Sequence, residues 1–372
     1  MSSISVNTIT DASGGATTTI NGFTPTVSNM AGRNRIINGD MRIDQRNAGA
    51  SVSPLSGGYG VDRWKGSYLG GGTGRFSAQQ SSTAPSGFVN SWLITVTTAD
   101  ASPASGYGYE VQQSIEGTNF YDLAWGTASA SAATLSFWVR SSVTGTFPIT
   151  LNNSAGDRLF GATYTINSAN TWEYKTVAVS GDTTGTWLTT TGVGVSVNFC
   201  LGGGSSRTIS TGWQAGSGST PTNVTGCTQL IATAGATFYI TGVQLEAGSV
   251  ATPFEHRQYG QELALCQRYY WRVSETSFFP TWGSGMCSAT TTARLYVKHP
   301  VNMRARPTYS YGGTVYVVAG SSIGIVSAIG GSNSTLSSAT VDLTTTGLPV
   351  GNGAISYPAS GLTNFVEAGA EL

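Results

Sequence analysis

The 372-residue chain is long enough for two or three domains, and only 10% of its residues are charged while 50 are glycine. Helix-favouring Glu, Lys and Arg are scarce, whereas residues that fit a pleated surface are common, so the composition predicts an all-β fold. The 18 basic and 18 acidic side chains balance without a basic run, which excludes nucleic acid as a partner. No apolar run approaches the roughly 20 residues of a membrane span, and the first residues lack a secretory signal. We therefore expect a soluble protein, made in the cytoplasm, that does not insert into membranes.

Residues 1–32 are small and polar, with short alternating pieces such as ISVNTIT and TTTINGF. Such a segment cannot bury a core of its own and gains order only against a partner. The sequence therefore predicts an extended N-terminal segment that attaches to another protein. In the denser stretch that follows, Ile36, Ile37, Met41 and Ile43 predict a short ordered element packed on the next domain.

Residues 33–255 carry recurrent strand signals, which are apolar or alternating runs separated by Gly, Asn, Asp or Ser clusters. The runs are NSWLITVTT, YEVQQSI, ATLSFWVRSS, FPITLNN, WEYKTVAVSGD, GVGVSVNFCL and ATFYITGVQLEAG. At this spacing they predict a two-sheet, jelly-roll-like β-sandwich. In ATLSFWVRSS, alternation puts Leu135, Phe137 and Val139 on the core face, and Trp138 on the other.

Residues 256–270 contain the best helix candidate, because Gln261–Tyr270 lacks Gly and Pro and is flanked by β runs. We expect a short linker helix there. Residues 271–372 again show short strand runs with Gly-rich turns, among them ARLYVKHPV, PTYSYGG, TVYVVAG, IGIVSAIG and NFVEAGAEL. They predict a second, small β domain.

The cysteines and histidines form no recognisable metal or catalytic pattern. The four cysteines match no CxxC spacing and are too few for a disulfide framework in a chain of this length. We expect reduced, mostly buried thiols, structural histidines and no cofactor or metal, although a Cys200–Cys227 disulfide stays open as an alternative. The residues concerned are Cys200, Cys227, Cys266, Cys287, His256 and His299.

Three stretches of the sequence are distinctive in combination and in this order. They are NRIINGDMRIDQRNAGASV followed by GYGVDRW, FYITGVQLEAGSVATPFEHR, and ELALCQRYY followed by VKHPVNMRARPTYS. Together they resemble the phage and prophage tail-fibre (receptor-binding) family, in which a carbohydrate-binding-module-like sandwich precedes a small C-terminal β domain. The resemblance covers roughly residues 33–310.

The resemblance implies a location in the phage tail, a homotrimer, and a role in attachment to the bacterial surface. Residues 1–32 match the family only in character, but because they have no core of their own we expect them to attach the chain to other tail or baseplate proteins. The residues at the matching motif positions are interpreted as fold determinants: Asp62, Arg63, Trp64, Gln244, Leu245 and Glu246. An ion pair between Glu246 and Arg63 would join the first and last elements of the sandwich, and the alternative is that both side chains are solvated.

Glycan cleavage is the main enzymatic alternative. A glycosidase needs two carboxylates about 5 to 10 Å apart, on either side of the scissile bond. The candidate pairs are Asp40 with Asp44 and Glu110 with Glu116, but each residue fits a turn or a solvated strand face better. We therefore expect a protein without enzymatic activity, and a glycan depolymerase stays as the lesser alternative.

Aromatic side chains in Gly/Ser surroundings are the remaining functional signal, because sugar rings stack on exposed aromatic rings. Rings inside strand runs, such as Phe137, Trp172, Phe238 and Tyr239, are expected in the core. The glycan-binding candidates are instead Tyr107, Tyr109, Trp213, Phe278, Phe279 and Trp282, whose loops make burial difficult. Bacterial surface polysaccharide is the expected ligand, and a purely structural virion connector, such as a baseplate or head-fibre protein, stays as the alternative.

Overall fold

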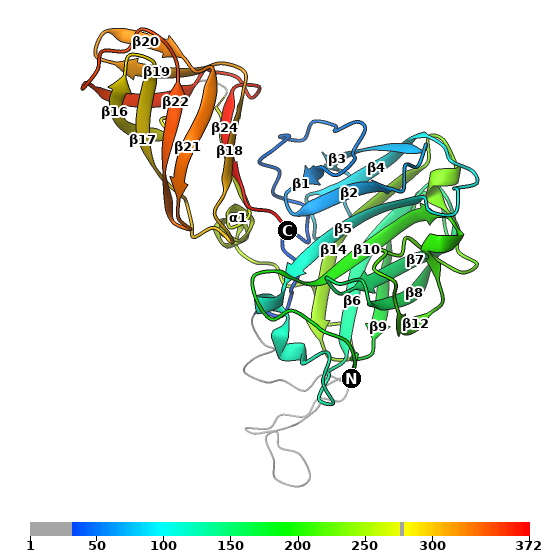
Figure 1. Cartoon of the computed structure of the whole chain (residues 1–372). Helices are drawn as coiled ribbons and strands as arrows, with labels where there is room; N and C mark the ends of the chain where they lie inside the picture. Colours follow the sequence, from blue (N-terminus) through cyan, green and yellow to red (C-terminus); the bar gives the residue numbers. More distant parts are fainter. Residues whose placement is uncertain (1–31, 276–278) are drawn as a thin grey trace, which may run out of the picture. The chain divides into compact units, whose positions relative to one another are not determined.

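The structure, a computed structural model, describes residues 32–275 and 279–372 (Figure 1). The predicted N-terminal segment thus lies almost wholly outside the described residues. The described chain forms two compact units. The sandwich unit contains residues 32–42, 51–60 and 64–256, and the C-terminal unit contains residues 43–50, 61–63 and 257–372.

The sandwich unit is built from two main antiparallel sheets (Figure 1). The seven-stranded sheet has the order β1 (Tyr59–Val61), β2 (Trp64–Leu69), β5 (Gly108–Glu116), β10 (Val193–Gly203), β7 (Gly145–Asn152), β8 (Arg158–Ile166) and β12 (Gly212–Ala215). The five-stranded sheet has the order β3 (Arg75–Ser81), β4 (Ser91–Thr98), β14 (Thr237–Ala247), β6 (Ala133–Ser141) and β9 (Glu173–Val179). A two-stranded parallel sheet and four single-turn 3-10 helices complete the description: β11 (Thr208–Ile209), β13 (Asn223–Val224), η1 (Gly117–Asn119), η2 (Tyr121–Leu123), η3 (Ser205–Arg207) and η4 (Leu230–Ala232).

The core of the sandwich follows from the alternation of side chains along its strands. Leu135, Phe137 and Val139 of β6 are fully buried, as predicted. Phe137 makes an edge-on contact with Phe199 of the opposite sheet, with ring centroids 5.0 Å apart. Trp64 is also fully buried, and its indole N–H donates to the Asn38 carbonyl. The motif tryptophan is therefore a core residue of this unit.

All seven runs that predicted strands in the sandwich correspond to strands of the structure, and the predicted all-β class is confirmed. The predicted short element is also buried at Ile36, Ile37, Met41 and Ile43. Strand β8 had no clear signal, because Gly161 and several small polar residues interrupt its apolar positions. Its place in the sheet is set by pairing with β7 and β12, and not by a strong local preference.

The C-terminal unit contains the predicted short helix, α1 (Tyr259–Gln267), followed by two sheets (Figure 1). The three-stranded sheet has the order β15 (Tyr270–Val273), β24 (Phe365–Gly369) and β18 (Thr308–Gly312). The seven-stranded sheet has the order β20 (Ser322–Ile325), β19 (Val315–Ala319), β23 (Gly353–Pro358), β16 (Gly283–Ala289), β17 (Thr292–Lys298), β22 (Ser338–Thr344) and β21 (Ala328–Ser334). None of the described helices is long and apolar enough to cross a membrane.

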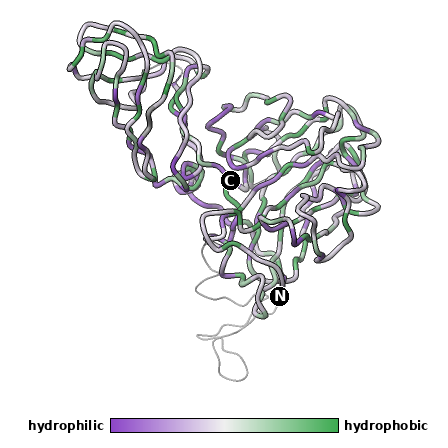
Figure 2. The backbone as a smooth tube through the Cα atoms, viewed as in Figure 1, coloured by the Kyte–Doolittle hydropathy of each residue, from purple (hydrophilic) through white to green (hydrophobic). Residues whose placement is uncertain are grey.

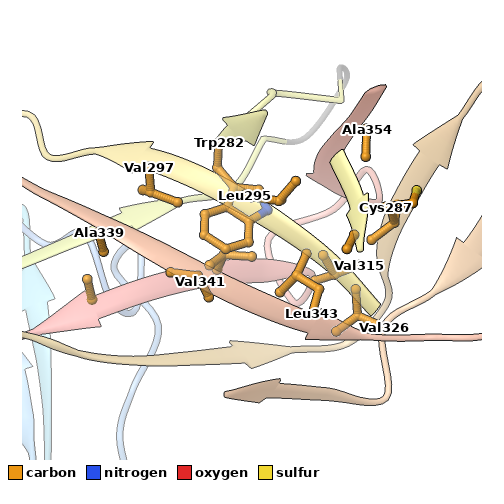
Figure 3. Packing of buried hydrophobic residues seen from close by; sticks show 14 of the residues in the cluster. Trp282, Cys287, Leu295, Val297, Val315, Val326, Ala339, Val341, Leu343 and Ala354 are labelled. Carbon is orange, nitrogen blue, oxygen red and sulfur yellow. The ribbon is translucent and has the colours of Figure 1, made fainter. Parts of the chain in front are cut away.

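One cluster of apolar side chains forms the core of the C-terminal unit (Figure 3). Trp282 lies in it beside Leu295 and Val341, which belong to the neighbouring strands β17 and β22. Figure 2 shows hydrophobic and hydrophilic positions alternating along the strands of both units. This alternation is the pattern of sheets with one face in a core.

The C-terminal unit also contains residues 43–50 and 61–63, which lie inside the range 33–255 predicted for the sandwich. Arg63 forms an ion pair with Glu371 and stacks on the Tyr269 ring, with the guanidinium 3.5 Å from the ring centroid. Arg46 also pairs with Glu371, at 2.8 Å. These contacts join segments about 300 residues apart in sequence, which local patterns cannot predict.

The predicted ion pair between Glu246 and Arg63 is wrong. Glu246 accepts hydrogen bonds from the Thr252 hydroxyl at 2.6 Å and from the Thr252 backbone N–H at 2.8 Å. The buried carboxylate is therefore satisfied by its own neighbourhood, and Arg63 has the carboxylate of Glu371.

An aromatic pocket as the candidate functional site

A pocket of about 670 Å³ lies on the outer face of the five-stranded sheet of the sandwich unit. Its position follows from strand alternation: Phe137 and Val139 point into the core, so Trp138 between them points away from it. The lining residues are Ser86, Gly87, Phe88, Trp138, Tyr174, Gly242, Ala251, Thr252, Pro253, Phe254 and His256. All of them belong to the sandwich unit.

Two aromatic side chains from neighbouring strands form one side of the pocket. Trp138 on β6 is the register partner of Tyr174 on β9. Their ring centroids are 5.4 Å apart with an interplanar angle of 52°. Tyr174 is 44% exposed, and Trp138 is half-buried. The pair therefore offers ring surface to a ligand while it is held in place by the sheet.

Three further rings form the opposite side, on two segments outside the sheet. Phe88 lies 5.2 Å from Phe254 and 5.3 Å from His256, measured between ring centroids. Phe254 and His256 lie 4.9 Å apart. Since these rings brace one another, the wall keeps its shape without a regular strand behind it.

Gly242 makes the close approach of the two sides feasible. It has a φ of +61° and lies in the bulge of β14 between Thr241 and Gln244. A Cβ atom at this position would lie 2.6 Å from Phe88 Cζ and 3.2 Å from Trp138 Cδ1. Any larger residue would push these rings apart, so the glycine is part of the pocket's construction.

A buried polar network fixes the segment that carries Pro253, Phe254 and His256. Gln244 Nε2 donates to Glu246 Oε1 at 2.9 Å, and Gln244 Oε1 accepts the backbone N–H of Glu255 at 2.8 Å. Together with the Thr252 bonds to Glu246, these contacts tie residues 252–255 to β14. The motif residues Gln244 and Glu246 thus hold one wall of the pocket in place.

The aromatic surface continues along the strands beyond the pocket. Arg140 lies two residues after Trp138 on β6, which is about 6.7 Å along a strand. Its guanidinium carbon lies 5.0 Å from the Tyr239 ring centroid, and Tyr239 contacts Trp172 at 6.0 Å. Trp172 and Tyr239 are half-buried, so the expectation of full core burial is confirmed only for Phe137 and Phe238. A ligand longer than one ring would meet this second group.

The chemistry of the pocket suits a sugar ring. Aromatic faces take the apolar face of a pyranose, and the hydroxyls of Ser86 and Tyr174 and the His256 imidazole lie at the same pocket to bond its hydroxyl groups. The lining contains neither Asp nor Glu. The pocket therefore has groups for binding and lacks the pair of carboxylates that glycoside cleavage requires.

The glycan-binding residues proposed from sequence are not part of this pocket. Tyr109 and Trp282 are buried, so the expectation that their loops would leave them exposed is wrong. Tyr107 and Trp213 are half-buried, and Phe279 is 55% exposed. Phe278 lies outside the described residues. The alternation in ATLSFWVRSS, which puts Trp138 on the face away from the core, was the sequence signal for the pocket.

Trp213 belongs to a compact cluster of rings. It lies 5.1 Å from Trp125, 5.6 Å from Trp187 and 5.0 Å from Phe160, measured between centroids. Its indole N–H donates to the Ser180 carbonyl at 2.7 Å. These contacts make the Trp213 ring part of the packing of the sandwich unit.

The carboxylate pair Glu110 and Glu116 cannot serve as a glycosidase pair. Both lie on β5, six residues apart, which corresponds to about 20 Å along the strand. Glu116 accepts a hydrogen bond from the Thr118 hydroxyl, and Asp40 forms an ion pair with Arg42. These partners explain the residues structurally.

Glu110 makes the stability of the protein depend on pH. Its side chain is 1% exposed and Oε2 has no hydrogen-bond partner, and desolvation raises its pKa to about 8 despite the charges of Arg207 and Lys65. The folded protein therefore keeps a proton that the unfolded chain loses, and stability falls as the pH rises from about 4.5 to about 8.

Glu110→Gln should remove this loss of stability, which is on the order of 3 to 5 kcal/mol between pH 5 and pH 9. Urea unfolding at both pH values measures it, and equal pH dependence in the two proteins would contradict it.

The histidines and cysteines form no metal site among the described residues. His299 is satisfied by the Leu336 carbonyl and the Tyr309 hydroxyl, and burial lowers the pKa of its imidazole. His256 is exposed at the pocket. All four cysteines are free, so the alternative of a Cys200–Cys227 disulfide is not realised in the structure, and burial raises the pKa of the Cys200 thiol.

No family model matches the sequence, and no curated protein matches it. Among solved structures, the enzymatically active domain of tailspike protein 4 of bacteriophage CBA120 is 14% identical, with a TM-score of 0.28, over 53% of this chain and 21% of that chain. The xylan-binding domain CBM22-1 of Paenibacillus barcinonensis Xyn10C is 11% identical, with a TM-score of 0.25, over 55% of this chain and 99% of that domain. The tandem domain CBM22-1–CBM22-2 of the same protein is 8% identical, with a TM-score of 0.27, over 87% of this chain and 97% of that chain. These identities and TM-scores assign neither a family nor a function.

Proposed function

We propose that the chain is a non-enzymatic tail-fibre subunit of a bacteriophage and that it attaches to glycans of the host surface through the aromatic pocket of the sandwich unit. The observation that carries the glycan proposal is the pocket itself. Rings on two sides face a volume of about 670 Å³, large enough for a sugar residue, with hydroxyl and imidazole groups at its lining.

The virion location rests on the motifs of residues 33–310, which resemble those of phage tail fibres. In this proposal the chain is made in the host cytoplasm and assembles as a homotrimer in the tail. Residues 1–32, which have too few apolar side chains for a core, attach it to other tail or baseplate proteins. The folded units then remain available for contact with the host.

Binding without cleavage is supported by the chemistry of the carboxylates. The pocket lining has none, and Glu110 and Glu116 are too far apart along β5 to act on one glycosidic bond. A depolymerase would need another pair of carboxylates at a ligand surface.

One experiment tests both parts of this proposal. The purified full-length chain is incubated with a panel of immobilised capsular polysaccharides and lipopolysaccharides, and retained protein and new reducing ends are measured together. We expect retention on at least one polysaccharide and no release of reducing ends. Steady release that a single carboxylate substitution abolishes would show an enzyme, and the lack of retention on every polysaccharide would favour a structural connector.

A further inference from the structure

The seven-stranded sheet of the C-terminal unit has one face in the core and one face that is apolar although it is exposed. The inward positions Leu295, Val317 and Val341 are fully buried. The outward positions of the sheet carry large apolar side chains as well. The exposed members are Met286 at 51%, Tyr296 at 57%, Ile323 at 65%, Ile325 at 62% and Ile355 at 41%, together with Phe279 at 55% in the segment before β16.

Strand register places these side chains next to one another. Val318 on β19 is paired with Ile323 on one side and with Ile355 on the other. Ser284 on β16 is then paired with Ile355 and with Tyr296. These five positions form a row across β20, β19, β23, β16 and β17, perpendicular to the strands.

A second row runs beside the first. Tyr316 is paired with Ile325 and with Tyr357, and the Tyr316 and Tyr357 rings lie 5.8 Å apart. Phe279 extends this row, with its ring 5.3 Å from that of Tyr357. We call the two rows, together with Met286, the apolar sheet face.

The size of the apolar sheet face is that of a protein interface. Large apolar side chains have on the order of 150–250 Å² each, so the six exposed members alone offer roughly 600 Å². Contiguous apolar patches on soluble monomers are mostly smaller than this. A standard protein interface buries about 800 Å² on each partner, which the half-buried members Tyr316, Val318 and Tyr357 bring within reach.

The composition of this face indicates which partner covers it. The face combines aliphatic side chains and Met286 with four aromatic rings, and the buried centres of protein interfaces are enriched in aromatic residues and methionine. The nearest charges flank Tyr296 on β17: Arg294 forms a bidentate ion pair with Asp342, at 2.8 and 2.9 Å, and Lys298 is exposed at the end of the strand. The two rows themselves carry no charged side chain, so they can be buried against the same face of another copy without burying a charge.

We propose that the apolar sheet face of the C-terminal unit is the surface on which copies of this chain associate, so that this face is buried against a second copy in the assembled protein. The proposal is independent of glycan binding by the sandwich unit. It names the surface that an oligomer of this chain would use.

Charges placed in the first row of the face test it. Ile323→Lys and Ile355→Lys together should reduce the mass measured by light scattering at 50 µM from a multiple of 38.4 kDa to 38.4 kDa, because two unpaired charges would have to be buried. Val89→Lys, at a 66% exposed position of the sandwich unit, is the control and should leave the mass unchanged. An unmodified chain that is monomeric at this concentration, or a folded double variant that keeps its mass, overturns the proposal.

A second measurement decides the case even if the double variant fails to fold. Ser284→Cys puts a thiol in the middle of the face, and Ser82→Cys puts one at an exposed site of the sandwich unit. Labelling by a maleimide should be at least tenfold slower at residue 284 than at residue 82 in the concentrated protein, with the unmodified chain as the background for the native cysteines. Equal labelling rates at the two sites would show that no copy covers the face.

Discussion

Replacing Trp138 and Tyr174 together by Ala is expected to weaken glycan binding about 100-fold. Truncating a well-packed aromatic contact residue typically costs at least about 2 kcal/mol of binding free energy. A loss of about 3 kcal/mol corresponds to the expected 100-fold decrease in affinity. Both side chains point away from the sandwich core, so the fold should remain. Calorimetric titration with the polysaccharide that the unmodified chain retains measures the change.

The matched control for this variant is Tyr121→Ala. Tyr121 is 61% exposed in η2 of the same unit and does not line the pocket. It should bind as the unmodified chain does. If the double variant keeps the full affinity while its circular dichroism spectrum is unchanged, the glycan site lies elsewhere.

Trp282→Ala is expected to destabilise the C-terminal unit by about 3 to 5 kcal/mol. Trp282 is 7% exposed within the core cluster of that unit (Figure 3). Its indole N–H donates to the Ser356 hydroxyl at 3.0 Å. The substitution leaves a cavity and removes the donor of a buried hydroxyl. Urea unfolding of the full-length chain, followed by circular dichroism, measures the shift.

Val350→Ala provides the comparison, because Val350 is 59% exposed in the same unit and lies outside the apolar sheet face. Its effect on the unfolding free energy should stay within about 0.5 kcal/mol. A Trp282→Ala protein as stable as the unmodified chain would mean that Trp282 is a surface ring, as its Gly/Ser surroundings in the sequence had indicated.

The strands could be predicted from the sequence because a buried sheet face imposes a period of two on the side chains. The same rule assigned Leu135, Phe137 and Val139 correctly to the core, and it placed Trp138 on the face where the pocket is found. The rule cannot predict which other segments of the chain pack on that face. Phe88 and Phe254 reach the pocket from segments without strand periodicity.

The glycine-rich surroundings of Tyr109 show why this residue was predicted incorrectly to be exposed. A Cβ atom at Gly72 would lie 2.4 Å from the Tyr109 hydroxyl oxygen, and one at Gly74 would lie 3.1 Å from Cε1 of the same ring. The Tyr109 hydroxyl also donates to Asp100 at 2.6 Å. These glycines make room for a buried ring, whereas the sequence pattern had indicated an open loop.

Long-range ion pairs were the other feature beyond sequence reasoning. Arg63 was expected to pair within the sandwich, yet its carboxylate partner is Glu371, 308 residues away. Nothing in the local pattern around either residue specifies the other. Ion pairs between distant segments depend on which segments the fold brings together, and local sequence patterns do not specify this.

The most direct test of the account is a crystal structure of the full-length chain with an oligosaccharide from the polysaccharide that it retains. The account predicts a sugar ring stacked on Trp138 and Tyr174, with the next ring toward Arg140 and Tyr239. An oligosaccharide bound at another surface, with the aromatic pocket empty, would contradict it.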